Sequence, residues 1–258
     1  MRIFIAAMFV AMVSTVGPVQ AQQQVELTIE NLQPNDGFFL TPVWAGFHNG
    51  GFDFFDAGAA ASTSLENLAE GGDVSGLVND FAAFGSGQDG VLANPGGFGG
   101  APVIDPGESV SMVFNLDATE RYLSFASMVI PSNDGFFGND DAMGIEVLDA
   151  GGNFVFGSPL EFTFAELWDS GTELNDGQGA AFSANGGTST DTTDAIALHA
   201  GLGNFDGTGT AAGTTINFGN ASASPAFRLT IAAVPEPNSL VVVGLLGMVG
   251  LARRNRKS

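Results

Sequence analysis

Apolar and polar residues alternate along several short stretches of this chain, with the spacing of β-strands that bury one face. In residues 25–30 the apolar Val25, Leu27 and Ile29 alternate with polar neighbours, and a period of two places successive side chains on opposite faces of a strand. Alternation or a short apolar run recurs at 110–116, 122–130, 143–148, 153–156, 160–164 and 227–231. Clusters of Gly, Asn, Asp and Pro separate these stretches, which predicts an all-β fold of the sandwich type.

Helical patterns are few. One helix is predicted to begin at Thr63, which with Glu66 has the spacing of a capping box, and to end at the Gly71–Gly72 pair. Its apolar stripe consists of Leu65, Leu68 and Ala69. A second short helical turn is expected at 77–84. Long irregular loops are predicted where Gly, Asn, Ser, Thr and Asp dominate, at 85–107 and in an insertion near 175–225.

The first 21 residues have the layout of a secretory signal peptide. Arg2 precedes an apolar stretch at 3–16, and a small-residue site follows that ends at Ala21. This order predicts export and cleavage between Ala21 and Gln22. The folded body is therefore expected to span residues 22–234 as one domain.

Residues 235–258 combine three parts in a fixed order. Pro235, Glu236 and Pro237 come first, an apolar run follows at 239–252, and a basic end closes the chain at 253–257. The run is shorter than the roughly 20 residues that a spanning helix needs, and the basic end resists translocation. A plain single-span anchor remains an alternative. The layout resembles the PEP-CTERM sorting signal of Gram-negative bacteria, which an exosortase recognises in the inner membrane.

The resemblance to this signal implies removal of the tail near the Pro-Glu-Pro motif. Contact with the membrane through 239–252 is then transient, and the mature protein is secreted or displayed at the cell surface. Exosortase is the partner expected during export.

The charge of the body, residues 22–234, limits the classes of partner that it can bind. Residues 22–234 hold 27 of the 28 acidic residues but only two of the seven basic ones, Arg121 and Arg228. Such a balance repels nucleic acid and anionic lipid and favours divalent cations. The chain has no cysteine, which excludes disulfides, a thiol nucleophile and a thiolate metal site. Its 23 phenylalanines supply apolar surface for a core.

A second set of motifs lies in the body. Residues 128–138 form an apolar strand followed by a Pro-Ser-x-Asp-x-Phe pattern, and residues 168–173 read Trp-Asp-Ser-Gly-Thr-Glu. Further segments are Leu-Thr-Ile-Glu-Asn-Leu at 27–32, Phe-Leu-Thr-Pro-Val at 39–43, Phe-His-Asn-Gly at 47–50 and Leu-Glu-Asn-Leu-Ala-Glu-Gly-Gly at 65–72. Together they resemble the spondin domain, the amino-terminal module of the F-spondin and mindin family. The resemblance covers about 25–176, and a final strand near 227–232 is expected to close the sheet.

The spondin resemblance implies an eight-stranded antiparallel β-sandwich that holds Ca²⁺ by loop carboxylates at one end. In this sequence Asp134 follows an apolar strand and a Pro-Ser turn, and Asp169 and Glu173 are separated by a Gly-containing turn that is expected to fold both carboxylates toward one point. Calcium takes six to eight oxygen ligands, and Asp140 and Asp141 are candidates for the remainder. Capping of turns is the alternative role for Asp134 and Asp169.

Two functional classes remain open. The preferred one is a non-enzymatic adhesion or structural protein of the surface or extracellular matrix, associated with a biofilm or exopolysaccharide, whose partners are polysaccharide or surface proteins. The alternative is an extracellular metal-dependent hydrolase acting on polysaccharide or phosphate esters. No Ser-His-Asp arrangement is visible in the sequence, and the two histidines, His48 and His199, are expected to be structural.

Overall fold

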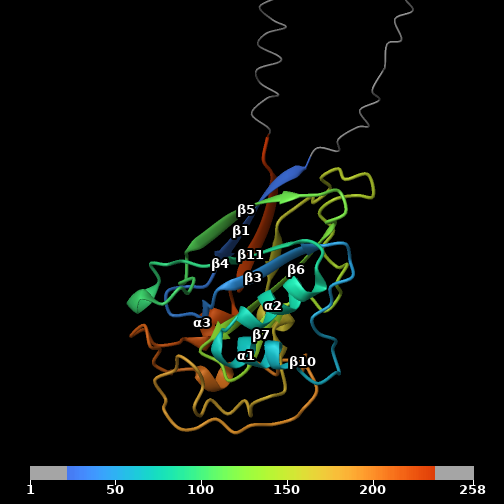
Figure 1. Ribbon diagram of the computed structural model, residues 1–258. Coiled ribbons are helices and arrows are strands. Elements are labelled where there is room, and N and C mark those ends of the chain that lie inside the picture. The colour runs from blue at the N-terminus through green and yellow to red at the C-terminus, as the bar shows by residue number, and fades with distance from the viewer. Residues whose placement is uncertain (1–21, 236–258) are drawn as a thin grey trace, which may run out of the picture.

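The computed structural model describes residues 22–235, which form two antiparallel β-sheets with short helices on one side (Figure 1). The four-stranded sheet has the order β5 (Ser109–Leu116), β1 (Gln23–Asn31), β11 (Phe227–Ala233) and β8 (Leu160–Phe162). The seven-stranded sheet has the order β10 (Ala197–Leu198), β9 (Trp168–Asp169), β7 (Gly135–Gly138), β6 (Tyr122–Ile130), β3 (Val43–His48) and β4 (Gln88–Leu92), and β2 (Phe39–Leu40) pairs with β6.

The sandwich predicted from the sequence is confirmed. Among the described residues there are eleven strands, of which β2, β9 and β10 have two residues each. The remaining eight are longer, which agrees with the eight-stranded sandwich that the spondin resemblance implies.

The main core lies between the two sheets. From the smaller sheet, β1 contributes Val25, Leu27 and Ile29, and from the larger sheet Phe125 and Phe137 pack into the same cluster. All five side chains are fully buried, which removes their apolar surface from water and supplies most of the driving force for folding. The polar residues that alternate with them on β1 lie on the outer face, as the period of two predicts.

Two helices cover the outer face of the larger sheet (Figure 1). Helices α1 (Thr63–Gly71) and α2 (Ser75–Phe84) pack with Trp44 of β3 and Phe136 of β7 in a second apolar cluster. The larger sheet is therefore buried on both faces, which is why every residue of β3 and nearly every residue of β6 is buried. A further helix, α3, spans Phe218–Ser222. Single turns of 3-10 helix occur at Phe98–Gly100, Phe164–Glu166 and Gly203–Phe205.

Helix α1 corrects the predicted capping box. The N-cap is Ser62, whose hydroxyl accepts a hydrogen bond from the backbone N–H of Leu65 at 3.2 Å. Thr63 is already the first helical residue. A capping box pairs the N-cap with the third helical residue, which is Leu65 here and not Glu66. The predicted apolar stripe is buried, and the helix ends at Gly72 in the left-handed conformation, with φ of 70°. The second predicted turn is a full helix, α2.

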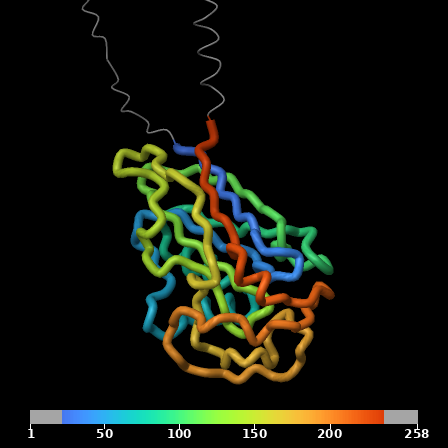
Figure 2. Tube along the Cα trace, turned by 180° about the vertical axis from the view of Figure 1, so that it is seen from behind, coloured from blue at the N-terminus to red at the C-terminus, as the bar shows by residue number. Residues whose placement is uncertain are grey.

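The last strand closes the smaller sheet, as expected. β11 lies between β1 and β8 (Figure 2), and Ala233 is opposite Val25 in the β1–β11 ladder. The described chain therefore begins and ends at the same end of the sandwich. The loops between β10 and α3 lie at the opposite end (Figure 1).

Besides the capping box, three local predictions are wrong. The apolar runs at 143–148 and 153–156 form isolated bridges, such as Leu148 with Phe154, and no named strand. The segment predicted as an irregular loop at 85–107 contains β4, which pairs along β3.

The export segments lie largely outside the described residues. This applies to the signal peptide and to the tail with Glu236, Pro237 and the apolar run 239–252. Within 22–235 no helix is long and apolar enough to cross a membrane.

Candidate functional site

The turn between β6 and β7 places Asp134 inside the protein. Ser132 holds the turn: its hydroxyl donates to the Val129 carbonyl at 2.6 Å and accepts from the Gly135 N–H at 3.1 Å. Asn133 fastens the turn to the following loop, because its side-chain oxygen accepts from the Gly177 N–H at 2.9 Å. Both Asn133 and Asp134 are fully buried.

The two oxygens of the Asp134 carboxylate have different surroundings. Oδ2 accepts three hydrogen bonds, from the Ser170 hydroxyl at 3.1 Å and from the backbone N–H groups of Thr172 and Glu173 at 2.8 and 3.0 Å. Oδ1 is buried and has no hydrogen-bond partner in the described residues. A buried carboxylate oxygen without a partner is costly, so Oδ1 is a position where a cation or a proton would be stabilised.

Strand pairing brings Asp169 to the same place. Asp169 ends β9, and its ladder partner on β7 is Gly135, the residue after Asp134. Its Oδ1 accepts from the Gly171 N–H and its Oδ2 from the Asn175 side chain, both at 2.7 Å. Each Asp169 oxygen is thus oriented by one donor and keeps further acceptor capacity.

The closeness of the two carboxylates perturbs the acidity of Asp169. Burial, followed by the negative charge of Asp134, raises the pKa of Asp169 from 3.8 to about 6. Burial and neighbouring acids, including Glu173, also raise the pKa of Glu70 on α1. These acids lack a cationic partner in the described chain, because Arg121 and Arg228 form their ion pairs with other acids.

His199 adds no positive charge to this cluster. Its Nδ1 accepts from the Gly201 N–H at 2.9 Å, so Nε2 carries the proton and donates to the Asn175 side-chain oxygen at 3.0 Å. Burial lowers the pKa of His199, which keeps the ring neutral. His199 therefore orients Asn175, and Asn175 in turn donates to Asp169.

The predicted ligands divide into two groups. Glu173 lies in the cluster with Asp134 and Asp169, where its Oε2 accepts from the Asn133 side chain at 3.4 Å. Asp140 and Asp141 lie beyond the other end of β7 and are not brought to Asp134. They accept hydrogen bonds from the N–H groups of Ala57 and Met143, both at 2.8 Å, and line a different cavity.

The donor set at this end of the sandwich suits a hard cation with two acidic ligands, Asp134 and Asp169. The described residues contain no group of three or more His, Asp or Glu side chains placed to hold a metal ion. The other oxygens that calcium requires would come from backbone carbonyls, hydroxyls, amides or water. The orphaned Oδ1 and the mutual repulsion of the two carboxylates are the features that fit such an ion.

Sequence reasoning missed four residues of this cluster, Asn133, Ser170, Asn175 and His199. Asn133 and Ser170 directly adjoin the predicted ligands, so adjacency was an available signal. Asn175 reaches Asp169 through the loop after β9, and His199 reaches the cluster through the pairing of β9 with β10, which joins Asp169 to Ala197. No spacing in the sequence indicates that contact.

Comparison with known proteins gives two family matches. A family model described as Spondin_N matches residues 34–199, and a model described as PEP-CTERM protein-sorting motif matches residues 233–257. No curated protein matches the chain. The first match contains the whole Asp134 cluster, and the second begins at the last residue of β11.

Proposed function

Because the chain belongs to the Spondin_N family and ends in an exosortase-recognised sorting motif, we propose that it is an adhesion or structural protein of the extracellular matrix. The motif directs export through the inner membrane of a Gram-negative bacterium to the cell surface or the extracellular space. The proposal adds that the domain contacts extracellular polysaccharide or surface proteins and that Ca²⁺ stabilises its loop end. Neither matched family is an enzyme family.

One observation carries the proposal: the sheet is complete at Val234, just before the Pro-Glu-Pro residues of the sorting motif. Ala233 pairs with Val25, and the N–H of Val234 donates to the Gln24 carbonyl at 2.8 Å. Cleavage at or after Pro235 therefore removes no residue of the sheet. A domain built in this way is released whole, which is what a protein delivered to the matrix requires.

The calcium part of the proposal is supported by Asp134 and Asp169. A cation between them would satisfy the buried Oδ1 and neutralise two carboxylates that repel each other. Such an ion would join the β6–β7 turn to the loop after β9 and stabilise the folded state by mass action. Calcium-rich surroundings outside the cell would then favour the folded domain.

Delivery is tested by changing Glu236 to Ala and following the protein through cell fractions. The unchanged protein is expected at the surface or in the medium without its tail, and E236A is expected to accumulate in the membrane at higher mass. Asn238→Ala, just after the Pro-Glu-Pro residues, is the matched control and is expected to be processed normally. Normal release of E236A would contradict the role assigned to the motif.

The matrix role is tested by applying the exported protein to a panel of immobilised polysaccharides with calcium present. Saturable retention without release of product supports an adhesion or structural role. Calcium-dependent release of soluble sugar or phosphate would replace it with the extracellular hydrolase. Retention on none of the polymers, together with no binding to the cell surface, would refute both.

A further inference from the structure

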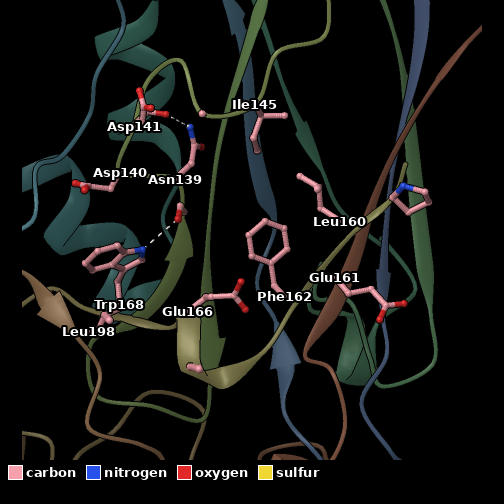
Figure 3. Close-up of a pocket in the computed structure, with 14 residues that line it drawn as sticks. Asn139, Asp140, Asp141, Ile145, Leu160, Glu161, Phe162, Glu166, Trp168 and Leu198 are labelled. Atoms are coloured by element: carbon pink, nitrogen blue, oxygen red, sulfur yellow. Dashed lines mark hydrogen bonds between the residues drawn. The ribbon is translucent and has the colours of Figure 1, made fainter. Parts of the chain in front are cut away.

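A cavity of about 550 Å³ opens between the edges of the two sheets, away from the Asp134 cluster. Figure 3 shows Phe162 and Leu160 of β8 on one side and Trp168 of β9 with Asp140 on the other. Its size falls within the range of small-molecule sites, which are mostly apolar with a few oriented polar groups.

Two aromatic side chains give the cavity rigid apolar walls. The Trp168 indole N–H donates to the Gly138 carbonyl at 3.2 Å, and the Phe55 ring packs edge-on against it at 5.3 Å. Phe162 stacks on Phe227, with ring centroids 4.6 Å apart and planes within 6°. Because these contacts already fix both rings, binding of a ligand against them costs little side-chain conformational entropy.

Three carboxylates lie beside these walls: Figure 3 shows that of Glu166 near the Phe162 ring, and those of Asp140 and Asp141 on the side of Trp168, directed away from Phe162. Asp140, Asp141 and Glu166 each use one oxygen to accept backbone N–H groups, at 2.8, 2.8 and 2.7 Å. Their other oxygens, Oδ2 of the two aspartates and Oε1 of Glu166, accept no hydrogen bond from the described residues. Each carboxylate is therefore held in orientation and keeps one oxygen for a ligand.

The charge of the lining selects the ligand. No lysine or arginine lines the cavity, and the ion pair nearest to it joins Arg228 to a fourth acid, Glu161. Asp140, Asp141 and Glu166 have no cationic partner in the described chain. An anionic ligand is repelled, and a ligand that carries positive charge gains charge-assisted hydrogen bonds.

We propose that this cavity binds protonated amino-sugar residues of a partly deacetylated extracellular polysaccharide. The C–H face of the sugar ring lies on Trp168 or Phe162, and the ammonium group meets one of the lining carboxylates, that of Glu166, Asp140 or Asp141. An amino sugar joins a rigid apolar face and a cation in one ring, which matches a lining that joins rigid aromatic walls and carboxylates. A lysine-bearing peptide offers the charge without the ring. The inference rests on the proposed matrix function and names its substrate class.

The test measures binding of a glucosamine hexamer to the exported protein by calorimetry at mildly acidic pH. The N-acetylglucosamine hexamer has the same rings without the charge, and hexalysine has the charge without the rings. The glucosamine hexamer is expected to bind at least tenfold more tightly than either. Stronger binding of hexalysine would overturn the inference in favour of a basic peptide, and equal binding of the acetylated hexamer would overturn the role of charge.

Two pairs of substitutions distinguish binding in the cavity from general attraction to the negatively charged protein. Asp140→Asn with Asp141→Asn keeps an oxygen for the Ala57 and Met143 N–H groups, so the fold is retained while two charges leave the cavity. Glu26→Gln with Asp80→Asn removes two charges at exposed positions outside it. The first pair is expected to weaken binding about tenfold and the second to leave it nearly unchanged.

Equal weakening by both pairs would show general attraction by a polyanion and would overturn the site. Retention of the unchanged protein on other polysaccharides, with no response to the cavity variants, would keep the matrix function and remove this inference alone. Circular dichroism of each variant confirms that the sheet is intact before binding is compared.

Discussion

Replacement of Asp134 by Asn is expected to change stability in opposite directions with and without calcium. Asparagine keeps an oxygen for the three donors that bind Oδ2, and it places an NH₂ group where Oδ1 has no partner. It also removes the charge that repels Asp169. Without calcium the variant should therefore be more stable than the unchanged protein, whereas with calcium it lacks a ligand.

The magnitude follows from the acidity of Asp169. The difference between 3.8 and about 6 corresponds to about 3 kcal/mol. Burial is the larger cause and Asp169 is partly exposed to water, so we assign roughly 1 kcal/mol to the charge of Asp134. For a domain of this size, D134N should melt roughly 2–4 °C higher in EDTA at pH 7.

The dependence on pH provides an internal check. Since the pKa of Asp169 is raised in the folded state, folded protein without calcium binds a proton more tightly than the unfolded chain. The contribution of this proton to the free energy of unfolding is fully present below about pH 4 and is lost as the pH rises through about 6. The advantage of D134N in EDTA should therefore disappear near pH 4.

The assay is thermal unfolding in EDTA and in a calcium series, with Asp140→Asn as the matched control. At 100 times the dissociation constant, calcium adds about 2.7 kcal/mol to a protein that binds it only when folded. The unchanged protein and D140N should show this gain, and D134N should not. An unchanged melting temperature of the native protein in low-millimolar calcium would refute the site and leave Asp134 as a turn cap.

Two further predictions concern stability. Burial lowers the pKa of the His48 imidazole from 6.5 to about 4, so as the pH drops the unfolded chain binds this proton before the folded protein does. The free energy of unfolding should therefore fall by up to about 3 kcal/mol between pH 6.5 and pH 4. When it is measured by urea unfolding at each pH, the free energy of His48→Gln should depend less on pH than that of the unchanged protein, and an equal dependence would contradict this. Phe137→Ala in the core between the sheets should cost about 3–5 kcal/mol, while Val113→Ala, 47% exposed, should cost less than about 0.5 kcal/mol; similar losses in urea would refute the assigned core.

The strands that could be predicted are those that bury one face. β1, β5 and β11 alternate because they form a sheet with one side in water. β4 escaped prediction because only Val91 and Leu92 of its five residues are apolar, and it lies in a segment rich in Gly and Asn. Gly90 in this strand faces side chains of β5: a Cβ there would lie 2.4 Å from the Met112 sulfur and 3.2 Å from the Phe114 ring, so these side chains would have to shift. Only the packed sandwich shows this close approach.

The sequence by itself determined the sandwich class, the export signals and the types of residue available for a cation. Those features depend on local order: a period of two, a hydrophobic run between charges, and acids beside turn residues. Which acids meet was decided by the tertiary structure. The β7–β9 ladder joins Gly135 to Asp169 and so brings Asp169 to Asp134. Asp140 is near Asp134 in sequence, but β7 lies between them and each strand residue adds about 3.3 Å, so the two acids lie beyond opposite ends of this strand.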